Sequence, residues 1–192
     1  QGAAFALTAP SVEIATTLAM NAGRIAITAT GGDVQLNAGS RLDVSGPSVQ
    51  LFDQVRGSAG GTVVLESRTG NVRQAAGALI DVSASLADAG TISVTAPGGR
   101  SDLFGTLNGQ ASDSAAGGKF ALRTGALGNF ADLNTTLDSG GFTASRSFDI
   151  ASGDLAVAGT LRAHTVAITA SGGSLRVLGT IDASGAKPGS IT

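Results

Sequence analysis

The sequence predicts an all-β fold and, within that class, a parallel β-helix (solenoid) with about 20 residues per turn. Two segments, GDLAVAGTLRA (153–163) and GSLRVLGTIDA (173–183), lie 20 residues apart and share their small and apolar positions, whereas the positions between these differ. A coil that stacks each turn on the previous one requires a constant offset, because each strand pairs in register with a strand about 4.8 Å away. Hairpin sandwiches do not require it, so the spacing favours the coil.

Short strands are predicted along most of the chain from the alternation of apolar and polar residues. Each run is rich in Val, Ile, Leu and Thr and is bounded by Gly, Ser, Asn or Asp, which is typical of half-buried strands. The alternation predicts an inward column of apolar side chains and an outward face that is free to vary. The runs are FALTA (5–9), RIAITA (24–29), DVQLNA (33–38), TVVLES (62–67), TISVTA (91–96), KFALRT (119–124), TVAITA (165–170) and SLRVLG (174–179).

We expect residues 1–192 to form a single β-helical segment of a longer protein, with one irregular excursion at 98–148. The regular pattern weakens there, and the stretch from 98 to 118 is typical of a loop. The stretch FADLNTTLDSGG (130–141) allows two interpretations. It is either a short amphipathic helix, with Asn129 as its N-cap and Gly140 ending it, or a polar loop with two buried leucines.

The composition excludes several functional classes. The 12 basic and 14 acidic residues are spread singly along the chain, so no basic stripe for nucleic acid is present. No apolar run approaches the ~20 residues of a membrane-spanning helix. The chain has no cysteine and a single histidine, His164, which lies between two strand-like runs. We therefore expect no catalytic residue, no cofactor, no metal site and no enzymatic activity.

Three aspartates occupy the same position in a recurring phrase: Asp43, Asp81 and Asp182. On adjacent turns they would form a row of carboxylates able to hold calcium. The 38 residues between Asp43 and Asp81 predict instead that these two are two turns apart. We therefore expect each aspartate to lie at a strand end and to accept hydrogen bonds from its own turn.

Other candidate positions have structural interpretations. Asn134, in the sequence NTT, is a formal acceptor for N-glycosylation or a residue on a helix face. The only glutamates, Glu13 and Glu66, are expected to be solvent-facing strand residues and not the paired carboxylates of a glycosidase. Five phenylalanines are expected to fill a core beneath the excursion, or else to form an exposed patch for a partner. They are Phe104, Phe120, Phe130, Phe142 and Phe148.

Three stretches together carry a family resemblance: GGDVQLNAGSRLDVSG (31–46), AGGTVVLESRTGNV (59–72) and residues 133–191, beginning LNTTLDSGGFTASRSFDIASGDLAVAGT. They resemble the repeat region of very large bacterial exoproteins of the filamentous haemagglutinin type, most densely over 119–192. The resemblance implies a right-handed parallel β-helical stalk at the cell surface of a Gram-negative bacterium, exported by a partner barrel in the outer membrane. It also implies a role in adhesion, aggregation or biofilm formation, with a host surface, a neighbouring cell or further copies of the fibre as partners.

The function expected from these observations is structural: a shaft segment of a secreted or surface-exposed bacterial fibre. Two alternatives remain open. A carbohydrate-active β-helical enzyme, a lyase or hydrolase, would gather three or more charged side chains in one groove. A receptor-binding module centred on 98–148 would present an ordered, protruding surface with exposed phenylalanines.

Overall fold

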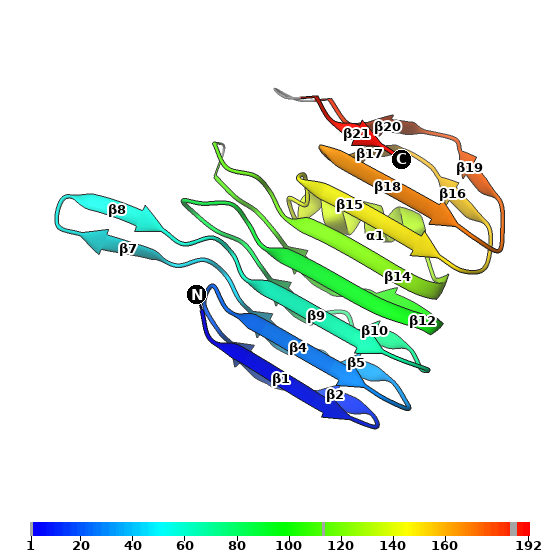
Figure 1. The fold of residues 1–192 in the computed structure, drawn as a ribbon, viewed down its shortest axis with the longest axis horizontal. Helices are drawn as coiled ribbons and strands as arrows, with labels where there is room; N and C mark the ends of the chain where they lie inside the picture. The colour runs from blue at the N-terminus through cyan, green and yellow to red at the C-terminus, as the bar shows by residue number, and fades with distance from the viewer. Residues whose placement is uncertain (1, 113, 185–187) are drawn as a thin grey trace.

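The computed structural model describes residues 2–112, 114–184 and 188–192. The fold is mostly β, with 52% of residues in strands and 5% in helix, and it contains large parallel sheets. The chain passes repeatedly through three stacks of strands, always in the same order, and we call each passage a circuit (Figure 1). This finding confirms the all-β class and the parallel pairing predicted from the alternating sequence pattern.

The first stack takes one strand from every circuit, and each strand is parallel to the next (Figure 1). Its strands are β1 (Ala4–Ala9), β4 (Arg24–Ala29), β9 (Thr62–Ser67), β12 (Thr91–Leu103), β14 (Lys119–Leu127), β15 (Ser145–Ile150), β18 (Thr165–Ala170) and β21 (Ser190–Ile191).

The second and third stacks contain shorter strands and are each interrupted once. The second stack comprises β2 (Val12–Ile14), β5 (Val34–Leu36), β10 (Val72–Gln74) and the ends of β12 and β14, followed separately by β16 (Leu155–Val157) and β19 (Leu175–Val177). The third comprises β3 (Thr17–Ala19), β6 (Arg41–Asp43), β11 (Leu79–Asp81) and β13 (Thr106–Asn108), followed separately by β17 (Thr160–Arg162) and β20 (Thr180–Asp182).

Inward side chains of the first stack lie directly over one another and form the core. The register pairs Ile27 with Leu65, and Leu65 with Val94, and all three are fully or almost fully buried. Burying one such side chain contributes about 1.5–3 kcal/mol relative to leaving it in water, so a column of them stabilises the whole stack. The complete column is Leu7, Ile27, Leu65, Val94, Leu122, Phe148 and Ile168.

The number of residues per circuit is not constant. The two repeated segments pair as predicted, Leu155 with Leu175 and Thr160 with Thr180, at a spacing of 20. By contrast, Thr28 pairs with Glu66, which lies 38 residues later. The additional residues leave the stacks as insertions, so the register is preserved where the predicted 20-residue spacing fails.

A helix replaces strands at the interruption of the second and third stacks. Helix α1 (Phe130–Ser139) follows β14 and packs against β13, β16 and β17. Of the two interpretations of this stretch the helix is correct: Asn129 is its N-cap and accepts hydrogen bonds from the backbone N–H groups of Ala131 and Asp132. This ten-residue helix is too short to cross a membrane, and no longer apolar helix occurs among the described residues.

The interval 98–148 is more regular than the expected excursion. It contains the end of β12, all of β13 and β14, and the beginning of β15, each paired in parallel with its neighbours. The glycine- and serine-rich composition misled the prediction, because Gly98, Gly99 and Ser101 lie within strand β12 itself. Among the described residues of this interval, the departure from stacking is limited to α1 and the connecting segments.

A second departure was not predicted from the sequence. Strands β7 (Ser48–Leu51) and β8 (Gln54–Gly57) form an antiparallel hairpin between β6 and β9. Figure 1 shows it projecting away from the three stacks, near the N-terminus. The hairpin accounts for ten of the additional residues in that circuit.

Candidate functional site

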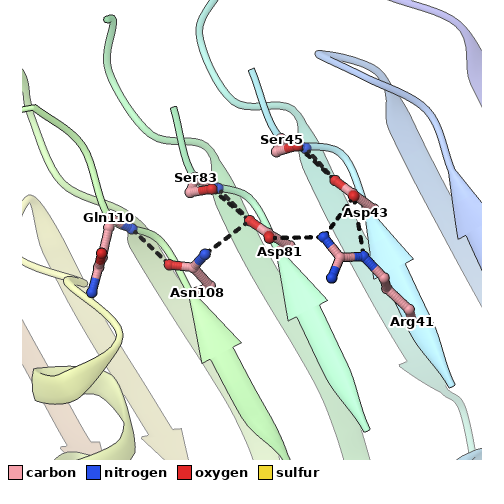
Figure 2. Close-up of polar contacts among 7 residues, drawn as sticks. All are labelled: Arg41, Asp43, Ser45, Asp81, Ser83, Asn108 and Gln110. Carbon is pink, nitrogen blue, oxygen red and sulfur yellow. Dashed lines mark hydrogen bonds and ion pairs between the residues drawn. The ribbon is translucent and has the colours of Figure 1, made fainter. Parts of the chain in front are cut away.

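A row of polar side chains follows the ends of the third-stack strands β6, β11 and β13. The strand register places Asp43 beside Asp81 and Asp81 beside Asn108. Figure 2 shows these side chains in one line, with the Arg41 guanidinium between the two carboxylates. We call the whole row the polar ladder; it consists of Arg41, Asp43, Ser45, Asp81, Ser83, Asn108 and Gln110.

The expectation that Asp43 and Asp81 lie two turns apart is wrong. Their strands are adjacent, because the 38 residues between them make up one circuit enlarged by the β7–β8 hairpin. Asp182 is not part of the ladder. It lies in the separate β17–β20 pair, where it accepts a hydrogen bond from Arg162 at 3.0 Å.

Each of the three aspartates accepts hydrogen bonds from its own turn, as predicted. Asp43 Oδ1 accepts from the backbone N–H of Ser45 at 3.0 Å, and Asp81 Oδ1 from that of Ser83 at 3.1 Å. The same two serine hydroxyls donate to these oxygens at 2.7 and 2.6 Å. The third case repeats this geometry: the backbone N–H of Ser184 donates to Asp182 Oδ1 at 2.9 Å. The recurring phrase therefore encodes a strand-end turn.

Arg41 joins the carboxylates of two circuits. Its Nη2 lies 2.8 Å from Asp43 Oδ2 and 3.2 Å from Asp81 Oδ2. Burial acts to raise the pKa of Asp43, but the hydrogen bonds from Ser45 and Arg41 outweigh it and hold that pKa below its usual value. The hydrogen bond to Asp43 raises the pKa of Arg41 in turn. Asp43 and Arg41 are thus both charged near neutral pH.

The Arg41 guanidinium occupies the place where a cation between the two carboxylates would bind. Calcium requires six to eight oxygen ligands, whereas Asp43 and Asp81 already direct their oxygens to Arg41 and the two serines. Among the described residues, no group of three or more His, Cys, Asp or Glu side chains has a geometry that would hold a metal ion.

A groove of about 720 Å³ lies beside the ladder and is bounded on its other side by α1. Asp81 and Asn108 line one wall, and Thr135 and Thr136 line the other. Both threonine hydroxyls donate to backbone carbonyls of α1 at 3.0 Å. The groove therefore offers polar surface in which these two hydroxyls already act as hydrogen-bond donors.

Asn134, the candidate glycosylation site, lies on the buried side of α1, with 6% of its surface exposed. Its Nδ2 donates to the backbone carbonyl of Thr160 at 2.9 Å, and its Oδ1 accepts from Arg146 Nη1 at 2.8 Å. A glycosylating enzyme requires that same side-chain nitrogen to be accessible. The folded geometry therefore favours the structural interpretation of Asn134.

Arg146 anchors α1 from an inward position of the first stack, and the sequence analysis missed it. Its side chain is fully buried and donates from Nε to the Phe142 carbonyl at 2.7 Å. Its Nη2 also lies 2.6 Å from Asp138 Oδ1 of the helix. The alternation of SRSFDI does place Arg146 inward, together with Phe148, so the pattern contained a signal for this residue.

Four of the five phenylalanines fill the core beneath α1, as expected. The ring centroid of Phe120 lies 6.1 Å from that of Phe142 and 6.0 Å from that of Phe148, and the Phe130 centroid lies 5.0 Å from Phe148. Phe104 differs, because 63% of its surface is exposed at the mouth of the groove.

The remaining candidates are scattered over the fold. His164 is exposed between β17 and β18, at the corner predicted for it. Glu13 accepts a hydrogen bond from Asn37, and Glu66 forms an ion pair with Arg68 at 3.4 Å. The structure therefore brings together Asp43 and Asp81 and leaves the other predicted site residues apart.

Comparison of the chain with protein-family models, with curated proteins and with solved structures finds no match in any of the three. The functional argument for this protein therefore rests on its own residues and geometry.

Proposed function

We propose that this chain is a right-handed parallel β-helix and that it serves as a structural shaft segment of a secreted or surface-exposed fibre. The observation that carries the proposal is the uninterrupted register of inward side chains from β1 to β18. Stacked strands of this kind resist bending and compression, because each is joined to the next by a full set of backbone hydrogen bonds. The shaft would hold other parts of a longer protein away from the cell.

The location and partners of the fibre belong to the same proposal and rest on the sequence resemblance alone. We place it outside a Gram-negative cell, exported through an outer-membrane barrel and supporting adhesion, aggregation or biofilm formation. A secretion domain upstream in the same reading frame, with a barrel gene beside it, is the observation that would test this part.

Two features argue against a carbohydrate-active enzyme. The two carboxylates of the ladder share the Arg41 guanidinium, and its hydrogen bonds help hold the pKa of Asp43 low, where glycoside hydrolysis needs one carboxyl with a raised pKa. The threonine hydroxyls of the groove donate to helix carbonyls and not to a general base.

The shaft proposal is tested by deleting one whole circuit. Removing residues 155–174 joins Asp154 to Leu175 and brings β19 and β20 to the positions of β16 and β17. Because the lost residues of β16 and β17 are replaced by their register partners in β19 and β20, and β21 takes the place of β18 in the first stack, we expect a cooperatively folding chain that is shorter by about one strand spacing, about 4.8 Å. Thermal unfolding and small-angle X-ray scattering measure the two quantities.

The matched control deletes residues 155–164, about half a circuit, which places inward residues at outward positions and should abolish cooperative unfolding. If the whole-circuit deletion unfolds as readily as this control, the circuits are not interchangeable structural units and the shaft proposal fails.

A further inference from the structure

The β7–β8 hairpin lies outside the stacks and buries almost nothing. Its strands pair only with each other among the described strands, and every one of their residues is exposed except Gly57, which is half-buried. Four apolar side chains nevertheless occur on it: Val49, Leu51, Phe52 and Val55, each with half or more of its surface exposed. Large apolar side chains gathered on one exposed element are typical of an interaction surface.

Phe52 lies at the tip of the hairpin and has a strained backbone conformation. Leu51 pairs with Gln54, so Phe52 and Asp53 form a two-residue turn. Phe52 has φ of +54°, a left-handed conformation that hairpin turns normally reserve for Gly, Asn or Asp, and its side chain is 99% exposed. Strain at a fully exposed aromatic side chain stabilises nothing within this fold, which indicates that the tip acts on something outside it.

A groove of about 580 Å³ runs beside β8. Its walls are the consecutive residues Gln54, Val55, Arg56 and Gly57, together with Leu86 from the connection between β11 and β12. Side chains of a strand alternate between the two faces of a sheet. A groove lined by consecutive residues therefore lies along the edge of β8 and not over one face of the hairpin.

The hydrogen-bonding groups of Val55 point into this edge. Bonded and non-bonded pairs alternate along an antiparallel hairpin. The Ser58 N–H donates to the Pro47 carbonyl at 2.9 Å, which makes Val49–Arg56 the next bonded pair and Gln50–Val55 a non-bonded one. The backbone N–H and C=O of Val55 are thus directed away from β7, toward the groove. An edge of this kind accepts a further strand.

The groove also specifies the side chains of that strand. Val55 and Leu86, 54% and 49% exposed, offer an apolar contact. Arg56 is the one charged residue of the lining, and it makes no ion pair among the described residues; its guanidinium only donates to Gln54 Oε1, at 3.4 Å. Because neighbouring residues on a strand face opposite sides, the complementary partner carries an acidic residue next to an apolar one.

We infer that the edge of β8 binds an extended peptide segment of another protein by strand addition, with an apolar side chain against Val55 and Leu86 and an adjacent carboxylate on Arg56. The backbone groups of Val55 supply hydrogen bonds that any sequence satisfies, whereas Leu86 and Arg56 supply selectivity. This binding function is separate from the shaft, because it uses a hairpin that contributes nothing to the stacked core.

The test selects binders from a displayed library of random peptides, each about ten residues long. We expect enrichment of peptides with Asp or Glu adjacent to a large apolar residue. Selection against the Arg56→Glu variant should enrich Lys or Arg at the same position instead, because the charge on the groove is reversed. Enrichment that is the same for both proteins, or none above background, overturns the inference.

The binding mode is tested with two proline variants. Val55→Pro removes an N–H that β7 does not use, so the hairpin should remain folded while a selected peptide binds at least about tenfold more weakly. Gln50→Pro removes the equivalent N–H from the opposite edge and should leave the affinity unchanged. Equal affinity for the Val55→Pro protein, with thermal unfolding showing both variants folded, overturns strand addition at β8.

Two occupants other than a peptide, a second copy of this chain and a lipid surface, would give distinct results. Sedimentation velocity that shows a dimer of this chain, lost in the Val55→Pro variant, assigns the edge to a second copy. Flotation with phosphatidylcholine–phosphatidylglycerol vesicles, lost in a Phe52→Ser variant, assigns the hairpin to a lipid surface. Either result overturns the inference of a separate protein partner.

Discussion

Asp43 and Asp81 share one cation although 38 residues separate them in the sequence: Arg41 Nη2 lies 2.8 Å from the first carboxylate and 3.2 Å from the second. Without the guanidinium, two carboxylates on adjacent strands would repel each other. The contacts of one side chain, Arg41, therefore stabilise the register between β6 and β11. They lie close to the point where the β7–β8 hairpin leaves the stack.

Replacement of Arg41 by Met should lower the free energy of unfolding by about 1 kcal/mol, a modest value because the guanidinium is partly exposed and screened by solvent. Thermal or urea unfolding measures this change. Arg68→Met, which removes an exposed side chain paired with Glu66 at 3.4 Å, is the matched control and should have almost no effect. Equal effects of the two substitutions would contradict a special role for Arg41.

The same pair predicts a pH dependence. The pKa of Asp43 is lower in the folded chain than in the unfolded one, so its stabilising contribution is complete above about pH 4, the ordinary aspartate value. That contribution is lost as the pH falls through this value toward the pKa of the folded state. The free energy of unfolding of the wild-type chain should therefore fall more steeply below about pH 4 than that of the Arg41→Met variant.

The sequence predicted where the strands lie better than it predicted which strands are adjacent. Alternation in RIAITA and TVVLES identifies two strands because the period of two is local. Which strands become adjacent depends on how many residues leave the stack between them, and SVQLFDQVRG contains no Gly, Asn or Pro at its turn to mark a hairpin. The ladder was therefore missed although both of its aspartates had been identified.

Arg146 should be essential for the helix. An Arg146→Ala variant leaves the Phe142 carbonyl and Asn134 Oδ1 without the donor that they have in the fold, and it leaves a cavity beside Phe120. We expect a loss of about 3–5 kcal/mol in the free energy of unfolding, from the unsatisfied buried acceptors and the cavity together. Asp138→Ala removes the carboxylate that pairs with this fully buried guanidinium, so it should also be strongly destabilising, by about 3–5 kcal/mol.

Hydrogen exchange followed by mass spectrometry distinguishes local from global effects of the Arg146→Ala substitution. Peptides covering α1 should lose protection first, while those covering β4 and β9 keep it. Uniform loss of protection would mean that Arg146 supports the whole stack and not the helix.

Asn134 should remain unmodified in the folded protein and should matter for stability. Asn134→Ala removes hydrogen bonds to Thr160 and Arg146 and should cost about 1–3 kcal/mol of unfolding free energy. Thr136→Ala destroys the same NTT acceptor sequence but removes only an exposed hydroxyl, so it should change stability by less than about 0.5 kcal/mol. Intact-mass spectra of the wild-type chain from a glycosylating host complete the test; a glycan on Asn134 of the folded chain would contradict the buried geometry.

Gly159 and Gly179 occupy equivalent positions in the two repeats, yet glycine is required at each for a different reason. Gly159 has φ of +79° and open space around the position of a Cβ, whereas a Cβ on Gly179 would lie 1.9 Å from the Gly159 carbonyl oxygen. Asparagine adopts positive φ with little strain, so Gly159→Asn should be nearly neutral and Gly159→Ala should cost about 1 kcal/mol.

At Gly179, substitution by asparagine and by alanine should destabilise the fold to a similar extent, because any side chain forces the backbones of the two circuits apart. Both Gly179→Asn and Gly179→Ala should destabilise the C-terminal circuits more than Gly159→Ala does, and thermal unfolding of the four variants measures the order. If asparagine restored stability at Gly179, backbone conformation would be the requirement there and the close approach of the two circuits would not.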